Sequence, residues 1–367
     1  MMWCFDFYIS ILAIFSILKV YGTESNITFD ENGYILYCPC MGRYGNQAEH
    51  FLGSIAFAKG LNRTLVLPPW RTYKNIKFSE FFEVAPLQEY HRVLLMEEFL
   101  EKIAPKYWPV GKRIGYCWLP PQSTVKCTLK EGNPFQQFWD ELGVDFDGYM
   151  SHHLSFDVED PYTKKEWELE FPPSSFPVLA LRGAPARFPV NEDHRHIQRY
   201  LKWSPHLLKQ VSKLISELLP KGPFVGIHLR NGLDWENACM HVEGLPNFMA
   251  SPQCLGYSQY RKLNKEICFP SKVEMLNRTK ATVERIKASA VYVATDNEPM
   301  LSDLKATLLE YKTHVVHANP PLPQIDLIIL AKSDFFIGNC VSSFTAHVKR
   351  ERDVNGLPSS FWGYTEK

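Results

Sequence analysis

The chain has 367 residues, of which 45% are hydrophobic and 14% aromatic, enough to fill the cores of about two ordinary domains. Lys plus Arg and Asp plus Glu both number 40, so no overall charge would attract nucleic acid or an anionic membrane. Repeats and low-complexity tracts are absent, which excludes solenoid and disordered architectures.

An apolar segment near the N-terminus predicts a secretory signal. Tyr8–Leu18 has the length of a signal-peptide core and is too short to span a membrane comfortably. The spacing of Val20 and Gly22 predicts cleavage after Gly22, so that residues 1–22 form the signal peptide. The segment before the core contains Asp6 and no Lys or Arg, which leaves an uncleaved membrane anchor as the alternative.

The cysteines and sequons fit an oxidising, lumenal compartment. Removal of Cys4 with the signal leaves eight of the nine cysteines, an even set without the C-x-x-C spacing of zinc sites. Their positions alone do not determine the pairing, and Cys38 and Cys40, separated by one proline, could each pair elsewhere. The three N-x-[ST] sequons predict exposed asparagines that can carry glycan: Asn26, Asn62 and Asn277.

The mature chain opens with a predicted strand, glycine-rich turn and helix. Tyr34–Tyr37 is a short apolar run typical of a buried strand. Gly42 and Gly45 allow a positive φ and close approach of a ligand to the backbone. Beyond Asn46, apolar residues recur with the helical period. The start of such a helix can bind phosphate, although the spacing is not that of the dinucleotide fingerprint, and an ordinary tight turn is the alternative.

The next segment continues the alternation of strands and helices. Thr64–Pro68 is a second strand that closes a βαβ unit, and strand-like and helix-like patches alternate to about Val190. Asp145 and Asp147 form the D-x-D pattern by which many sugar-nucleotide enzymes hold a divalent metal. The tripeptide is common and no long apolar strand precedes it, so we do not expect a metal site there.

The second half opens with the apolar strand Phe224–Arg230, whose polar residues gather at its end. Arg230 would project into the crevice beyond the strand, where its planar guanidinium suits a phosphate; a structural salt bridge is the alternative. His228 lies on the same strand face and is either a core histidine or part of the site. Residues 231–270 contain three cysteines and little periodicity, which predicts a disulfide-tied excursion.

The C-terminal part repeats the opening pattern. Asp326 lies one turn into a helix that we interpret as amphipathic, either as an exposed or capping acid or as a hydrogen-bond partner for a nucleoside. Ser342 and Ser343 are candidate N-caps after a strand, and such a start again offers N–H groups to an anion. The predicted elements of this part are helix 274–288, strands 291–295 and 314–317, helix 324–332, strand 335–338 and a helix from 343 to about 352.

Strands alternating with helices in both halves predict two α/β domains with mostly parallel sheets. The polar segment Phe188–His196 marks their boundary, which gives residues 23–195 and 196–367 as the two domains. Ligands of such sheets bind beyond the carboxyl ends of the strands, so we expect the site between the domains.

Several long strings resemble the GDP-fucose protein O-fucosyltransferases that act on EGF-like repeats, and the match covers nearly all of the mature chain in order. The matching strings are Cys38–Gln47, Glu131–Phe135, Gly183–Ala186, Gly226–Arg230, Phe248–Cys254, Ile337–Ala346 and Lys349–Asp353. The resemblance implies transfer of fucose from GDP-fucose to Ser or Thr hydroxyls of folded EGF-like repeats, such as those of Notch-type receptors, in the endoplasmic reticulum lumen. It also implies two facing Rossmann-like domains in the GT-B arrangement, with the active site in the cleft between them.

The resemblance further implies an inverting reaction without a metal or other cofactor, in a monomer that is not inserted in a membrane. Arg230 would be essential, because it would hold the β-phosphate and stabilise the charge on the leaving GDP. Asn46 could orient the acceptor hydroxyl. The implied donor contacts are Arg43, Tyr44, Gly45, Asn46, His228, Leu229, Arg230, Asp326, Ser343 and Phe344. The implied disulfides are Cys38–Cys40, Cys117–Cys127, Cys239–Cys268 and Cys254–Cys340.

One feature departs from the family. Its vertebrate members end in a KDEL-like tetrapeptide, whereas this sequence ends with Gly363–Lys367, so retrieval to the reticulum is not supported. Onward leakage, retention by a partner and an incomplete C-terminus all stay open. The alternative functions are a chaperone for EGF-repeat receptors that acts independently of catalysis, and a related nucleotide-dependent transferase such as a sulfotransferase.

Overall fold

The computed structural model describes residues 28–72, 74–258 and 260–364. The predicted signal peptide, its cleavage point and the sequon at Asn26 lie outside these ranges. Within them, no helix combines the length and the apolar character that a membrane span requires.

The N-terminal unit (residues 28–191) is built on a sheet of six parallel strands in the order β5-β2-β1-β8-β6-β7. The central strand β1 shows why both faces are covered: Ile35 and Tyr37 pack into one core cluster, and Tyr34 and Leu36 into another. The strands are β1 (Tyr34–Tyr37), β2 (Thr64–Leu67), β5 (Val93–Leu95), β6 (Ile114–Trp118), β7 (Gly148–His152) and β8 (Val178–Leu181).

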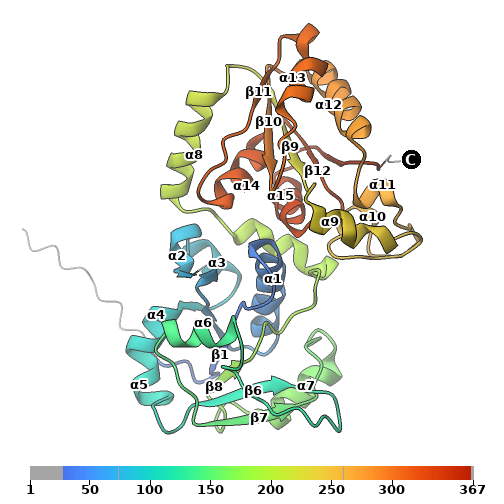
Figure 1. The fold of residues 1–367 in the computed structure, drawn as a ribbon. Helices are drawn as coiled ribbons and strands as arrows, with labels where there is room; N and C mark the ends of the chain where they lie inside the picture. The colour runs from blue at the N-terminus through green and yellow to red at the C-terminus, as the bar shows by residue number, and fades with distance from the viewer. Residues whose placement is uncertain (1–27, 73, 259, 365–367) are drawn as a thin grey trace, which may run out of the picture.

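Helices cover the two faces of this sheet (Figure 1). Helix α1 (Tyr44–Gly60) leads from β1 to β2 and shares its core cluster with α7 (Pro161–Glu170). The other face carries α4 (Met96–Glu98), the π-helical turn η1 (Phe99–Ile103), α5 (Ala104–Tyr107) and α6 (Phe135–Glu141). The remaining elements are the antiparallel pair β3 (Trp70–Arg71) and β4 (Asn75–Ile76), α2 (Phe78–Phe81) and α3 (Ala85–Tyr90).

The C-terminal unit (residues 205–364) has a second parallel sheet, with five strands in the order β11-β10-β9-β12-β13. The strands are β9 (Phe224–Leu229), β10 (Ala290–Thr295), β11 (His314–Val316), β12 (Phe335–Gly338) and β13 (Ser359–Phe361). Helices α8 (Pro205–Leu218), α14 (Pro323–Lys332) and α15 (Ser343–Val354) share one core cluster with the sheet. Helices α12 (Lys272–Ile286) and α13 (Leu301–Thr307) share the other; a short 3-10 turn, η4, spans Leu309–Tyr311.

The predicted elements agree with the structure in type and differ in detail. Helix α1 begins at Tyr44, before Asn46. The prediction that α14 is amphipathic is wrong: Gln324 through Ala331 are all buried, because the helix packs against α8, α15 and the sheet. The predicted boundary after Arg195 falls inside the 3-10 helix η2 (Glu192–Tyr200) and stays a prediction.

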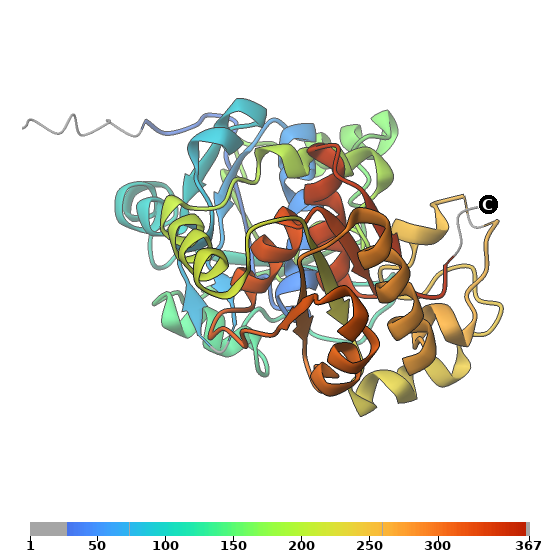
Figure 2. The same ribbon diagram turned by 90° about the horizontal axis from the view of Figure 1, so that it is seen from above.

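The two units meet over a continuous buried core. Helix α1 of the N-terminal unit contacts α15 of the C-terminal unit, and both views show the two helices together (Figures 1 and 2). Phe82 and Trp203 stack at 4.4 Å between ring centroids, and His347 of α15 lies 5.3 Å from the Trp203 ring. Glu49 of α1 and Arg350 of α15 form an ion pair that is almost completely buried. This packing holds the carboxyl edges of the two sheets in a defined relation.

Candidate active site

The turn between β1 and α1 is shaped by a disulfide and a glycine. Cys38 and Cys40 are bonded to each other, with 5.1 Å between their Cα atoms, so the alternative that each pairs elsewhere is wrong. Gly42 has a φ of 72°, the left-handed conformation expected of it. Gly45 does not have positive φ; it belongs to the first turn of α1.

Gly45 instead allows the two units to approach one another closely. A Cβ atom at Gly45 would lie 2.6 Å from Ser343 Oγ and 2.8 Å from the backbone nitrogen of Phe344, both in the C-terminal unit. Beside it, Ser343 Oγ donates a hydrogen bond of 2.6 Å to Asn46 Oδ1. The Asn46 side chain, one of the two predicted catalytic groups, is therefore oriented by a hydroxyl from the opposite unit.

Gln47, which the sequence analysis did not identify as a site residue, holds the same turn through side-chain hydrogen bonds. Its Nε2 donates to the carbonyl oxygens of Arg71 at 2.6 Å and Gly42 at 3.3 Å. Its Oε1 accepts a hydrogen bond of 2.9 Å from the backbone nitrogen of Arg71. Because Gln47 is buried inside an otherwise helical pattern, its polarity was the one signal in the sequence that could have indicated this role.

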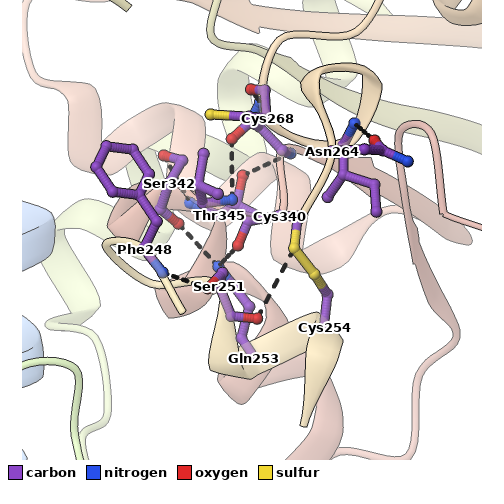
Figure 3. The surroundings of a disulfide bond; sticks show 12 residues. Phe248, Ser251, Gln253, Cys254, Asn264, Cys268, Cys340, Ser342 and Thr345 are labelled. Carbon is purple, nitrogen blue, oxygen red and sulfur yellow. Dashed lines mark hydrogen bonds between the residues drawn. A yellow bond between two sulfur atoms is a disulfide. The ribbon is translucent and has the colours of Figure 1, made fainter. Parts of the chain in front are cut away.

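The start of α15, in the C-terminal unit, lies opposite the turn between β1 and α1. Ser342 is the N-cap, since its Oγ accepts a hydrogen bond from the Thr345 backbone, and Ser343 is the first helical residue. Gln253 donates to the carbonyl oxygens of Cys340 at 2.8 Å and Ser342 at 3.0 Å (Figure 3). These contacts hold the turn that carries Ser343.

The predicted excursion at 231–270 holds this turn in place. Cys254 is bonded to Cys340, directly before the turn, and Cys239 is bonded to Cys268 (Figure 3 shows the first bridge). Asn339 Nδ2 donates to the Cys268 carbonyl at 2.8 Å. The excursion consists of short elements: α9 (Leu233–Ala238), η3 (Cys239–His241), α10 (Pro252–Leu255) and α11 (Lys265–Cys268).

Arg230 follows β9 directly and lies between carboxylates. Its Nη2 is 2.8 Å from Asp234 Oδ2, and its Nη1 forms an ion pair with Asp296. The guanidinium also lies over the Trp235 ring, 4.6 Å from the centroid. The salt-bridge alternative is therefore present in the structure, at the same strand edge where we predicted a phosphate site.

The partners of Arg230 were missed by the sequence analysis. Asp234 lies four residues after Arg230, on α9. Asp296 directly follows β10, the strand that pairs with β9. Since the carboxyl ends of neighbouring parallel strands meet at one edge, the same argument that selected Arg230 could have found Asp296. Arg230 and, to a smaller extent, Arg43 lower the pKa of Asp234, so the charge of Arg43, from the N-terminal unit, acts on this cluster.

His228 is a buried, neutral imidazole next to the predicted donor contacts. Its Nδ1 lies 2.7 Å from Thr345 Oγ1, and its ring centroid is 4.7 Å from that of Phe344. Burial, together with the charge of Arg230, lowers the pKa of His228 to about 3. The imidazole is therefore uncharged at any pH of the secretory pathway and can act there only as a neutral hydrogen-bonding and packing group.

Asp326 is buried on α14, so the interpretation as an exposed or capping acid is wrong. The Tyr292 hydroxyl donates a hydrogen bond of 2.6 Å to its Oδ1. Burial raises the pKa of Asp326 to about 6, although the tyrosine hydroxyl favours the ionised form. Asp326 is accordingly a carboxylate at neutral pH, with a second oxygen free of the tyrosine bond.

Two predicted donor contacts have side chains that cannot line a cleft. The Tyr44 side chain packs against Trp70 and His347. Leu229 is the last residue of β9, and its side chain lies in the core on one face of the sheet. Both could reach a ligand only through their backbone groups. The side chains that the structure brings together from the two units are those of Arg43, Asn46, His228, Arg230, Ser343 and Phe344.

The D-x-D carboxylates have structural partners. Asp145 forms an ion pair with Lys130. Asp147 Oδ2 accepts hydrogen bonds from the backbone nitrogens of Gly111 at 2.8 Å and Arg113 at 2.9 Å. Within residues 28–72, 74–258 and 260–364, no group of three or more His, Cys, Asp or Glu side chains could hold a metal ion.

The fourth bridge and the two described sequons lie outside this cluster. Cys117 is bonded to Cys127, so the structure contains all four pairs that the resemblance implied. Asn62 and Asn277 are exposed, as a glycan acceptor must be, and their glycosylation stays a prediction.

Comparisons with known proteins agree with this architecture. The family described as GDP-fucose protein O-fucosyltransferase matches residues 34–355. GDP-fucose protein O-fucosyltransferase 1 of Caenorhabditis elegans is 40% identical over 375 aligned positions, covering 97% of this chain and 96% of that protein. The crystal structures of POFUT1 in its apo form and in complex with GDP-fucose each have a TM-score of 0.88 and 42% identity, covering 92% of this chain and 100% of theirs. Together with the two parallel sheets, this likeness confirms the expected fold, two facing Rossmann-like domains in the GT-B arrangement.

Proposed function

This chain belongs to the GDP-fucose protein O-fucosyltransferase family and is a glycosyltransferase, and from that premise we propose that it fucosylates Ser or Thr hydroxyls of folded EGF-like repeats, as in Notch-type receptors. The reaction inverts the anomeric centre and needs no metal, in a monomer of the endoplasmic reticulum lumen. The observation that carries the proposal is the hydrogen bond between Asn46 and Ser343, because it joins a predicted acceptor-side group to a predicted donor-side group.

Arg230 binds the diphosphate in this proposal. The bond between fucose and the β-phosphate breaks, the sugar becomes oxocarbenium-like, and a negative charge develops on GDP. A fixed guanidinium stabilises that charge. In the free enzyme, the carboxylates of Asp234 and Asp296 hold the guanidinium at the strand edge. When the donor binds, its diphosphate replaces these carboxylates as the ionic partner of Arg230. Arg43, whose charge lowers the pKa of Asp234, supplies a second positive charge.

Asn46 orients the acceptor. Its Oδ1 accepts from Ser343, which leaves the amide nitrogen to bind the incoming hydroxyl oxygen. That oxygen attacks the anomeric carbon as the bond to phosphate breaks. A phosphate oxygen of the leaving GDP takes the hydroxyl proton, because no carboxylate contacts Asn46 among the described residues.

Asp326 selects the base. The edge of guanine that carries N1–H and the 2-amino group presents two donors, which a carboxylate accepts and which adenine lacks. An ionised Asp326 therefore favours GDP-fucose over the adenine phosphosulfate that a sulfotransferase would use.

Mass spectrometry of a folded EGF-like repeat, incubated with the enzyme, GDP-fucose and EDTA, tests the donor, the acceptor and the metal requirement together. We expect the mass of one fucose to be added, and the reduced, unfolded repeat to stay unmodified as a control. Transfer that occurs only after Mn²⁺ is restored would contradict metal independence, and equal transfer to the unfolded repeat would contradict recognition of the fold.

A further inference from the structure

Three neighbouring strands of the first sheet are each followed by an arginine. Arg43 lies in the turn after β1, Arg71 ends β3, the short strand that comes after β2, and Arg182 directly follows β8. The order β2-β1-β8 and a spacing of about 4.8 Å between strands place the three strand ends within about 10 Å of one another. All lie at the carboxyl edge of the sheet, where ligands of α/β proteins bind. The charge of Arg43 acts on the Arg230 cluster, whereas Arg71 and Arg182 (the arginine pair) have no part in the proposed reaction.

The arginine pair converges on one loop. Arg71 Nη2 donates a hydrogen bond of 3.2 Å to Asn133 Oδ1. The Arg182 guanidinium lies over the Phe135 ring, 4.9 Å from its centroid. Asn133 and Phe135 are two positions apart, a separation of at most about 7 Å between their Cα atoms, so the two guanidiniums contact the same short loop. Gln47 binds both the backbone of Arg71 and the turn before α1, which places the Arg71 backbone beside the turn that leads to Asn46.

Both members of the arginine pair are partly buried and lack a carboxylate partner among the described residues. Two other arginines of the same unit differ: Arg92 pairs with Asp30 and Arg187 with Asp157. A guanidinium carries five N–H donors, and the contact to Asn133 uses one of those of Arg71. The pair therefore offers several donors and two positive charges to a ligand, in a chain whose overall charge is zero.

We propose that the arginine pair binds a carboxylate side chain of the acceptor protein, close to the hydroxyl that receives the sugar. This inference rests on the proposed function, in which the N-terminal unit is the acceptor side. The planar forks of two guanidiniums match a carboxylate, and such a contact would fix the register of the acceptor against Asn46. The donor diphosphate is the less suitable ligand, since the proposed function already assigns it to Arg230.

The first test replaces both charges. The double variant Arg71→Gln/Arg182→Gln should raise KM for a folded EGF-like repeat about tenfold, with kcat and KM for GDP-fucose unchanged within about twofold. Added NaCl should raise the acceptor KM of the wild type more steeply than that of the double variant. Arg285→Gln is the matched control, because Arg285 lies over the Phe335 ring at 4.2 Å on α12 in the other unit.

The second test identifies the partner group. Each Asp or Glu of the repeat is changed to its amide in turn, and KM for each changed repeat is measured. One of these changes should raise the KM of the wild-type enzyme but should not raise the KM of the double variant any further. Additive losses for every amide would overturn the proposal. A rise in KM for GDP-fucose would show that the arginine pair binds the donor. A lower kcat together with a lower melting temperature would show that the pair only stabilises the loop. Failure of the wild-type enzyme to modify any repeat would instead contradict the proposed function itself.

Discussion

Arg230 shows how a single side chain can satisfy both a structural and a functional interpretation. Its ion pairs with Asp234 and Asp296 hold the guanidinium in one place at the end of β9. Half-buried charges need such partners in the absence of an anion. In the proposed reaction, the same geometry would present the guanidinium donors to the diphosphate without further ordering of the side chain.

We expect Arg230→Ala to lower kcat/KM for fucose transfer by about a thousandfold or more, because an arginine that neutralises a leaving phosphate contributes on that scale. Arg230→Lys should retain part of the activity, since a point charge replaces the fork. Turnover is measured with a folded repeat, and the fold by circular dichroism. Arg278→Ala is the control, because it removes an i,i+4 ion pair, with Glu274, far from the site. Near-normal turnover of Arg230→Ala would rule out this mechanism, and a receptor whose secretion that variant restores would support the chaperone role.

Asp326 gives a prediction for pH. Its pKa is raised to about 6, and only the ionised form accepts the guanine donors, so affinity for GDP should fall as pH falls through about 6. Calorimetric titrations with GDP, carried out from pH 5 to pH 8 in steps of about one unit, measure this change in affinity. Asp326→Asn should bind weakly at every pH. Tyr292→Phe removes a hydrogen bond that favours the ionised form, and should move the midpoint to higher pH. A wild-type affinity that is independent of pH would contradict this role of Asp326.

At the scale of elements, the site depends on the close approach of the N-termini of α1 and α15. Gly45 is the point of contact. A methyl group there would lie far inside van der Waals distance of Ser343 and of the Phe344 backbone, so either the helices move apart or the turn distorts.

Gly45→Ala should therefore destabilise the protein by about 1–3 kcal/mol and reduce transfer, because the Asn46–Ser343 hydrogen bond is displaced. Urea unfolding and acceptor kinetics provide the two readouts. Gly183→Ala is the matched control, since a Cβ atom there would meet nothing within 4 Å. Equal stability and activity in the two variants would show that the contact is not tight in solution.

At the scale of the whole molecule, the two units are joined by a core that includes buried charges. The Glu49–Arg350 pair lies between α1 and α15, and Glu49 also accepts a hydrogen bond of 3.0 Å from the Val190 backbone. Removing one partner of such a pair leaves an uncompensated buried charge, so a substitution of Glu49 or Arg350 alone should destabilise the packing between the units.

Glu351, in the same core, predicts how stability changes with pH. Burial raises its pKa from 4.5 to about 7, against the hydrogen bond from Trp203 and the charges of Lys202, Lys332 and Arg352. Because the folded-state pKa is the higher one, the stabilisation is complete below about pH 4.5 and is lost as pH rises through about 7. Its other close neighbour, His347, is kept neutral by burial.

Glu351→Gln should remove this dependence and be more stable than the wild type at pH 8 by about 2 kcal/mol, while the Trp203 nitrogen keeps an acceptor. The difference in unfolding free energy between the two proteins, measured from pH 5 to pH 8 in steps of about one unit, isolates this carboxyl from the other groups. A constant difference over that range would contradict the prediction.

Local pattern was sufficient for the elements and for the family motifs. Short continuous runs of apolar residues located β1, β9 and β12, because a strand buried on both faces needs apolar residues on each. The helical period located α1 and α12 to within a few residues at their ends. The same patterns could not show that α14 is buried on every side, since that depends on which helices pack against it.

Tertiary structure alone decided which side chains meet. Asn46 and Ser343 are 297 positions apart, and no spacing in the sequence links them. Packing between elements likewise decides three other features: the carboxylates beside Arg230, the hydrogen bonds of Gln47 to Arg71, and the burial of the Tyr44 ring against Trp70. By itself, the sequence determined two α/β units and the residue types of their site, because periodicity and motifs are local. Their arrangement as one site required the fold, since contacts across two domains depend on distances that local spacing does not contain.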